Sequence, residues 1–421
     1  MGKRIILKMI TSLLCLILFA CSSQEPVELK FRITWTDYSG RGVAIQKVVD
    51  SYNETNKNVH IVLESGDEDF DALDRLLNDD QSNTIYVLPY RYVSYFGSKN
   101  KLSNISSDFV GVKDFYYPEL WNLGKSNSEL VGIPWLSHSI CLIYNKKILN
   151  EAGVDVQSIV SLDTLVIALE KVKSNTDAYG IGLVGKNHND VSWMVNQFIY
   201  GFGSRLIDDT KTKVIINNEQ SKEALSFYKD VLGQYAQPTW LDDTGVEIMS
   251  YFRDEKLAFE FQGVWGVTDI EKNGKKFETG IINLSDIGLS PEVGPLFLSI
   301  GKEMLSEQRN EAIKFIHYMI STEAQEKIMK GEYSPEHDRY YPFRVPARRD
   351  LTESLVFKEN PQYIPFTTGF INPSIDVPSA QWQIIKNEIY APGLHDVMTG
   401  ILSIEDFLNR VEVEGDKILN Q

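Results

Sequence analysis

The sequence predicts an α/β protein of two lobes, and three observations support this. Near the N-terminus, short β-rich runs alternate with helical segments in the order strand, helix, strand, helix, strand, which favours a largely parallel sheet covered by helices. A second series of strands and helices follows from residue 140 onward. The chain has 421 residues, more than one hydrophobic core usually supports.

The elements of the first lobe follow from the spacing of apolar residues. Apolar and polar residues alternate from Leu29 to Trp35, as in a half-buried strand. Apolar residues then recur at helical spacing between residues 44 and 52. The runs at 59–63 and 85–88 predict two more strands, separated by an acidic helical stretch.

The second lobe is predicted in the same way. Residues 140–144 form an apolar run, and Ser161 precedes a helical pattern that it can cap. Helical faces recur at 224–232 and 311–320, and residues 297–300 predict a strand between them. The pair Thr322 and Gln325 is typical of a capping box at the start of a further helix.

The N-terminus has the three parts of a lipoprotein signal. A basic start (Lys3, Arg4, Lys8) precedes the apolar run 9–19, which is too short to span a bilayer as a stable helix. The segment that follows, Leu-Phe-Ala-Cys, ends at Cys21 and is typical of a lipobox. We therefore expect residues 1–20 to be a cleaved signal peptide, Cys21 to carry lipid, and residues 21–28 to be a polar tether. This predicts an extracytoplasmic protein that lipid anchors to the cell membrane.

Charge and cysteine content exclude several classes. The formal net charge is −16, and such an acidic surface repels phosphate backbones, so nucleic acid is not an expected partner. Of the three cysteines, Cys15 leaves with the signal and Cys21 carries the lipid, so Cys141 has no partner for an internal disulfide. The six histidines show no metal-binding spacing, and no phosphate-binding or hydrolase motif occurs. We expect no cofactor, no metal and no catalytic residue.

Several blocks, in this order, resemble one family. They are LKFRITWTD, VGIPWLSHSICLIYNKKIL, YGIGL, LAFEFQGVWGV, the helical block EAIKFIHYMISTEAQEKIM and YPFRVPARRD. Together they look like the extracellular solute-binding proteins of carbohydrate ABC transporters, the group that includes maltose-binding protein. The chain departs from the family pattern at IYVLPYRYVSYF and at 283–295. These departures concern the ligand more than the fold.

The resemblance implies a periplasmic-binding-protein fold, in which two α/β lobes are joined by a hinge that the chain crosses several times. Lobe 1 would comprise 29–134 plus 296–331, and lobe 2 would comprise 140–290 plus 341–421. The crossings would lie near 134–139, 290–295 and 332–340. A ligand would bind between the lobes, which would close on it. The resemblance also implies ABC permease subunits as partners of a protein that we expect to be a monomer.

Candidate ligand-binding residues follow from position and from the resemblance. Sugars present apolar faces, on which aromatic rings stack, and hydroxyl groups, which polar side chains bind. The candidates chosen by position lie after strands or near a crossing: Trp35, Asp37, Asp67, Tyr90 and Arg344. The resemblance adds Trp265, where the family commonly places a stacking ring, and more loosely Trp193 and Trp382. Each aromatic residue could instead belong to the core, which is the common place for Trp and Tyr.

Two glycines flank Trp265, and they predict a turn at a strand end with room for a flat ligand beside the indole. The leading hypothesis is therefore capture of a sugar or oligosaccharide for an ABC importer. Two alternatives remain open. The same fold could bind another solute, such as a polyamine, ferric ion or a phosphorylated compound. A surface glycoside hydrolase would require a pair of catalytic carboxylates, which the 58 acidic residues could supply.

Overall fold

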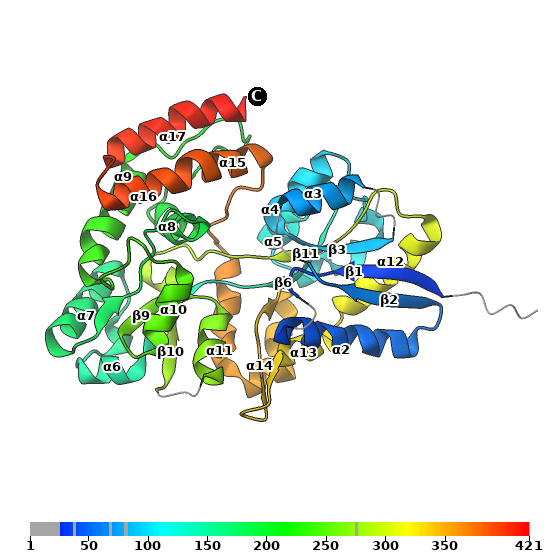
Figure 1. Ribbon diagram of the computed structural model, residues 1–421, viewed down its shortest axis with the longest axis horizontal. Coiled ribbons are helices and arrows are strands. Elements are labelled where there is room, and N and C mark those ends of the chain that lie inside the picture. The colour runs from blue at the N-terminus through cyan, green and yellow to red at the C-terminus, as the bar shows by residue number, and fades with distance from the viewer. Residues whose placement is uncertain (1–25, 37–38, 67–69, 80–82, 274–276, 421) are drawn as a thin grey trace, which may run out of the picture.

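Two β-sheets, each covered by helices, divide the chain into two lobes that lie side by side (Figure 1). The computed structural model describes residues 26–36, 39–66, 70–79, 83–273 and 277–420. The expected fold, two α/β lobes joined by a hinge of several crossings, is confirmed. The predicted signal peptide and Cys21 lie outside the described residues. Within those residues, no helix is both long enough and apolar enough to span a membrane.

The sheet of the first lobe has six strands. Their spatial order is β14 (Val345–Pro346), β6 (Ile133–Ser137), β11 (Leu296–Ile300), β3 (Thr84–Pro89), β1 (Val27–Arg32) and β2 (Val59–Glu64). The helices that cover it are α2 (Gly40–Thr55), α3 (Phe70–Asn78), α4 (Tyr90–Ser98), α5 (Pro118–Leu123), α12 (Ser306–Met319) and α13 (Thr322–Lys330). Every residue of β3 is buried, because strands and helices enclose it on all sides.

The expectation of a largely parallel sheet is only partly correct. β1 pairs in parallel with both β2 and β3, as the strand–helix order predicts. The pairings β3–β11, β11–β6 and β6–β14 are antiparallel. β11 enters the sheet from the second lobe, and its direction is therefore set by the hinge and not by a strand–helix–strand unit.

The sheet of the second lobe has four strands, in the order β10 (Thr279–Ile282), β7 (Cys141–Asn145), β9 (Leu257–Gln262) and β8 (Tyr179–Ile181). Its helices are α6 (Lys146–Glu151), α7 (Leu162–Asn175), α8 (Asn189–Gly201), α9 (Glu219–Ser226), α10 (Gly245–Arg253), α11 (Val264–Lys272), α15 (Ala380–Ile385), α16 (Ala391–Thr399) and α17 (Ile404–Leu419). Ser161 caps α7 as predicted. For α13, however, the N-cap is Ser321, one residue before the expected Thr322.

Three segments cross between the lobes and lie next to one another. The first joins β6 to β7, and the second joins β10 to β11. They run antiparallel: Ile140 N donates to Glu292 O at 2.9 Å, and Gly294 N donates to His138 O at 3.2 Å. The third crossing pairs with the second through Ser374, whose N donates to Pro291 O at 2.9 Å. The hinge is thus a ribbon of laterally bonded strands.

The structure places the third crossing later than the sequence predicts. Residues 332–341 form the hairpin of β12 (Glu332–Ser334) and β13 (Arg339–Tyr341) instead of a passage between lobes. β14 then pairs with β6 in the first sheet, and α14 (Leu355–Glu359) packs on α13. Residues 341–359 therefore belong with the first lobe, and the following segment, Pro361–Phe370, contacts both β14 of the first sheet and β10 of the second.

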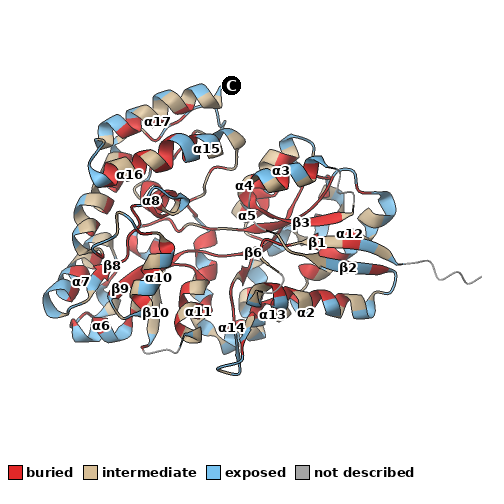
Figure 2. Cartoon of the chain, viewed as in Figure 1, coloured by how far each residue is buried: buried red, intermediate tan, exposed pale blue. Residues whose placement is uncertain are grey.

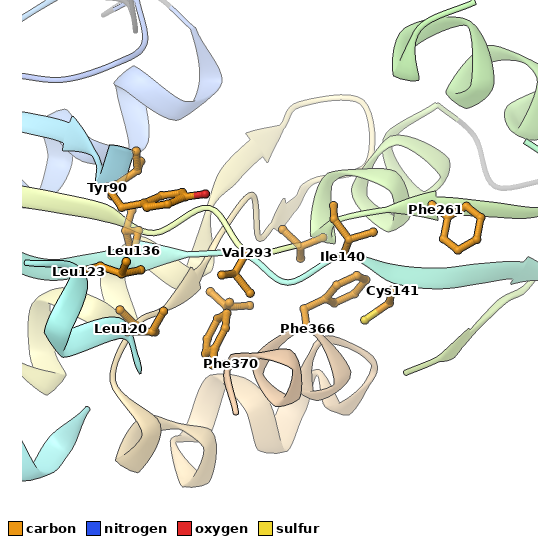
Figure 3. Packing of buried hydrophobic residues seen from close by; sticks show 14 of the residues in the cluster. Tyr90, Leu120, Leu123, Leu136, Ile140, Cys141, Phe261, Val293, Phe366 and Phe370 are labelled. Atoms are coloured by element: carbon orange, nitrogen blue, oxygen red, sulfur yellow. The ribbon is translucent and has the colours of Figure 1, made fainter. Parts of the chain in front are cut away.

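One apolar core runs through both lobes and the hinge. Buried residues follow the two sheets and continue between them (Figure 2). At the hinge, Ile140 and Val293 from the first two crossings lie above Phe366 and Phe370 (Figure 3). Cys141 lies in this packing and is buried, and burial raises the pKa of its thiol. The thiol therefore acts as a small apolar group.

Candidate functional site

A cavity of about 350 Å³ lies where the second lobe meets the hinge. We call it the interlobe cavity. Its walls are His138 and Ile140 from the first crossing, Glu292 from the second, Arg344 before β14, and, from the second lobe, Asp190, Trp193, Gly245, Val246, Met249, Gln262 and Trp265. Its volume is within the range of small-molecule sites, about 300–1,000 Å³.

Three helices of the second lobe begin at this cavity. Trp193 lies in the first turns of α8, Gly245 is the first residue of α10, and Trp265 is the second residue of α11. The start of α10 is fixed by a capping box, in which the backbone N of Thr244 donates to the Glu247 carboxylate at 2.8 Å. Three elements distant in sequence thus bring two indole rings and their polar neighbours to one place.

Gly263 makes room for the Trp265 ring itself. A Cβ atom on Gly263 would lie 2.4–2.8 Å from three ring carbons of Trp265, closer than atoms can approach. The sequence predicted that this glycine leaves space for the ligand, and that Trp265 ends a strand. In the structure β9 ends at Gln262, Gly263 is the N-cap of α11, and the space holds the indole. Any side chain at 263 would displace the ring.

The hinge side of the cavity carries a charged cluster. Arg344 donates from Nη1 to Nδ1 of His138, and since a guanidinium only donates, Nδ1 must accept. The hydrogen of the ring is therefore on Nε2, which donates to Glu292 Oε2 at 3.0 Å. The Arg344 guanidinium lies 5.1 Å from the centre of the Trp265 ring, and the His138 ring meets that indole edge to face at 4.7 Å.

The structure brings three predicted residues to the cavity. Trp193, Trp265 and Arg344 all line it, and both tryptophans are partly exposed. Trp35 does not line it, but its ring packs edge to face on Phe343, next to Arg344, with the ring centres 5.3 Å apart. Asp37 and Asp67 lie outside the described residues.

Two other predicted residues, Tyr90 and Trp382, are buried away from the cavity. Tyr90 is 2% exposed and Trp382 is 0% exposed. Both contact Asp376: its backbone N donates to the Tyr90 hydroxyl at 2.9 Å, and its carboxylate accepts from Trp382 Nε1 at 2.6 Å. The Lys386 ammonium also lies 2.6 Å from this carboxylate. These rings form part of the packing of the third crossing.

The comparisons with known proteins agree with this architecture. The family described as bacterial extracellular solute-binding protein matches residues 47–362, about three quarters of the chain. The chain belongs to this family. The resemblance inferred from the sequence is thereby confirmed.

Relatives of this solute-binding protein differ in their named ligands. This chain is 30% identical over 137 residues to the xylose/arabinose-binding protein XacG of Haloferax volcanii. The alignment covers 32% of this chain and 30% of XacG. It is 26% identical over 223 residues to the probable amino-acid ABC transporter periplasmic-binding protein y4oP of Sinorhizobium fredii, with 52% and 43% covered. The alignments thus span less than half of either relative.

A solved structure supports the fold. The sugar-binding protein MalE of Xanthomonas citri matches 94% of this chain and 98% of its own, with a TM-score of 0.78 at 18% identity. At this identity the match speaks for the two-lobe architecture alone.

Four polar side chains that line the cavity of this solute-binding protein were not predicted from the sequence: Asp190, Gln262, His138 and Glu292. One signal was available for the first two, because each precedes a tryptophan by three residues at the start of a helix, in DVSW and QGVW. A side chain at this spacing can reach the indole N–H. No comparable signal marks His138 and Glu292, which meet only because two crossings 154 residues apart run side by side.

Acidic and histidine residues do not gather into a metal site in the part of the chain that the structure describes, where no group of three or more could hold an ion. The cavity instead offers two indole rings, one imidazole, one guanidinium, two carboxylates and one amide. This combination can hold an uncharged polar ligand by its apolar faces and by its hydroxyl groups.

Proposed function

We propose that this solute-binding protein captures a carbohydrate in the interlobe cavity and delivers it to the permease of an ABC importer. The observation that carries the proposal is the pair of partly exposed indoles, Trp193 and Trp265, beside Asp190, Gln262 and Glu292 in one cavity. Rings supply stacking surfaces, and the polar groups can bind hydroxyls around them. The sugars named for XacG are consistent with this ligand class.

The cavity favours a neutral sugar over a polyamine. An amine requires a carboxylate that is free to accept its hydrogens. Asp190 already accepts from Trp193 Nε1 at 3.1 Å and from Gly245 N at 2.9 Å. Glu292 accepts from His138, and the Arg344 guanidinium nearby repels a cation. Both acidic groups of the cavity thus already bind donors of the protein, and their remaining lone pairs can accept from the hydroxyls of a neutral ligand.

The same bonds argue against hydrolysis of a bound glycoside. A hydrolase needs one carboxylic acid that gives its proton to the leaving group. Each oxygen of Asp190 is held by a donor of the protein, Trp193 Nε1 on one and Gly245 N on the other, which directs this carboxylate to the indole and to the start of α10 and not to a scissile bond. The protein is therefore proposed to bind and release its ligand unchanged.

Titration calorimetry tests the ligand class. Mature protein, starting after Cys21, would be titrated with D-xylose, L-arabinose, maltose, spermidine and an amino-acid mixture, and a chromogenic glycoside would be incubated with it in parallel. We expect saturable binding of at least one sugar and no release of the chromophore. Binding of spermidine or an amino acid with no sugar bound would contradict the proposal, and chromophore release would make the protein an enzyme.

We propose further that lipid on Cys21 holds the protein at the outer face of the cell membrane. The tether expected at 21–28 is shortened to 21–26, because Val27 and Glu28 pair with β2 as part of β1. The support is the basic, apolar and small-residue order that ends at Cys21. Labelled palmitate should enter the wild-type protein and not the Cys21→Ser variant. Equal labelling of the two proteins would contradict the lipid anchor.

A further inference from the structure

Both cavity tryptophans have their indole N–H groups bound within the protein. Trp265 Nε1 donates to Gln262 Oε1 at 2.7 Å, and Trp193 Nε1 donates to Asp190 Oδ1 at 3.1 Å. An indole has this single donor and no acceptor. The two rings can therefore offer a ligand only their faces and edges.

The two acceptors are joined to each other through the backbone of Gly245. Gln262 Nε2 donates to Gly245 O at 3.1 Å, and Gly245 N donates to Asp190 Oδ2 at 2.9 Å. The bonds thus form one continuous path, from Trp265 through Gln262 and Gly245 to Asp190, where the bond from Trp193 also ends. We call these five residues the indole string.

These bonds favour a cooperative unit. Trp265 donates to Gln262, Gln262 to Gly245 and Gly245 to Asp190, so the donors all point toward the same carboxylate. The C=O and the N–H of Gly245 belong to different peptide groups, so the two halves of the string are coupled through the position of Gly245 at the start of α10 and not by continuous polarisation. The charged acceptor strengthens the bonds that reach it directly. Gln262 is 2% exposed, so water does not replace a bond that is lost there. Breaking the middle of the string should therefore affect both of its ends.

We propose that Asp190 and Gln262 are positioning residues, which fix the orientations of Trp193 and Trp265 as one unit so that the ligand meets both rings by their faces. The string orients the two rings whatever the ligand is, whereas its role in binding a sugar rests on the proposed function. The string joins α8, α10 and the β9–α11 turn, so it also fixes the spacing of the three elements that bear the rings.

Indole N–H signals in ¹⁵N–¹H spectra of ligand-free mature protein test the string directly. The signals of Trp193 and Trp265 would be assigned from Trp193→Phe and Trp265→Phe. In Gln262→Met, which has a similar shape but neither donor nor acceptor, we expect both signals to move. The matched control is Gln237→Met, because Gln237 is also a buried, hydrogen-bonded glutamine of the second lobe, and its bonding partners, Leu183 and Asp243, are not among the five residues of the string. It should leave both signals in place.

A second variant tests the acceptor oxygen and the donor nitrogen of Gln262 separately. Gln262→Glu, studied at pH 8, keeps an oxygen that accepts from Trp265 but has no hydrogen for Gly245 O. We expect the Trp265 signal to stay shifted downfield, as in the wild type, and the Trp193 signal to move. If the Trp193 signal is unchanged in either Gln262 variant that folds, the tryptophans are independent and the string is overturned. This reading remains available even if one of the variants folds poorly.

The recognition part is tested with whichever of D-xylose, L-arabinose or maltose binds the wild type most tightly. Gln262→Met should weaken that sugar about tenfold, since the rings lose their fixed orientation. Gln237→Met should bind as the wild type does. Wild-type affinity in Gln262→Met, despite displaced indole signals, would overturn the positioning role. If no sugar binds the wild type, the proposed function fails, while the indole signals still decide the string.

Discussion

Two aspartates of the second lobe accept an indole N–H, and their surroundings differ. Asp190 holds Trp193, which is partly exposed at the interlobe cavity. Asp376 holds Trp382, which is fully buried and packs beside Tyr390, while Lys386 pairs with the carboxylate. The local bond is the same at both places. What separates the cavity-facing tryptophan from the buried one is therefore the exposure of the ring and not the partner of its N–H.

The largest expected effect is the loss of stability on removing the buried ring. Trp382→Ala leaves a cavity in the packing of the third crossing and should lower the free energy of unfolding by about 4 kcal/mol. Trp193→Ala, at a partly exposed position, should cost far less. Urea unfolding followed by circular dichroism compares the two. Equal losses would show that the two sites do not differ as their exposure indicates.

The next largest effect concerns the ion pair beneath that ring. Lys386 is 5% exposed in its side chain and lies 2.6 Å from Asp376. Lys386→Met leaves the carboxylate buried without its cation and should lower the free energy of unfolding by about 3 kcal/mol. The exposed pair of Lys146 and Glu278 supplies the control, since Lys146→Met should cost less than about 0.5 kcal/mol. Chemical unfolding measures both.

On the cavity side, the expected effect is on affinity. Trp265→Ala removes a stacking surface and should weaken sugar binding by about 2 kcal/mol, roughly thirtyfold, with little change in melting temperature. Trp240→Ala serves as the control, because Trp240 is also partly buried in the second lobe but does not line the cavity. Calorimetry and a melting curve should be recorded together. Unchanged affinity in Trp265→Ala would assign this ring to the core.

The smallest effect concerns Glu260, a carboxylate of β9 that is sealed from the cavity. Burial, and then the nearby Asp269 carboxylate, raise the pKa of Glu260 well above its ordinary value of 4.5, although Arg253 opposes this. The folded state therefore binds a proton that the unfolded chain releases, and stability falls as pH rises from 4.5 toward the raised pKa. Glu260→Gln should remove this loss and stabilise the protein by about 1 kcal/mol at pH 8. Unfolding curves at pH 5 and pH 8 would show it, and an equal effect at both would contradict it.

The sequence could not distinguish Trp193 from Trp382, and the reason is physical. Both follow a helix start in similar polar contexts, DVSW and SAQW. The burial of each ring depends on what packs over it. Over Trp382 this is the third crossing, which was expected at 332–340 but pairs with the second crossing at Ser374. β14 has only two residues, too few to show a period, so the return of the chain to the first sheet left no signal.

Elements with longer patterns were predicted well. The strands at 59–63 and 85–88 and the helix after Ser161 all lie within one or two residues of their observed bounds. At the site, Trp193, Trp265 and Arg344 reach one cavity. Asp190 and Gln262 each hold a tryptophan three residues further along, so a local spacing could have marked them. His138 meets Arg344 only through the tertiary fold, and its local sequence carries no such signal.

The bonded ribbon at the hinge has a mechanical consequence. Backbone hydrogen bonds between neighbouring crossings keep their spacing and register fixed, which leaves torsion about the ribbon axis as the softest relative movement of the lobes. His138 and Glu292 belong to this ribbon and also form a wall of the cavity. Twisting the ribbon therefore reshapes the wall that a ligand touches. His138 and Glu292 thus belong both to the hinge, about which the lobes would turn, and to the cavity wall, which a ligand would contact. A ligand that contacts them acts on the hinge directly, without any other element between.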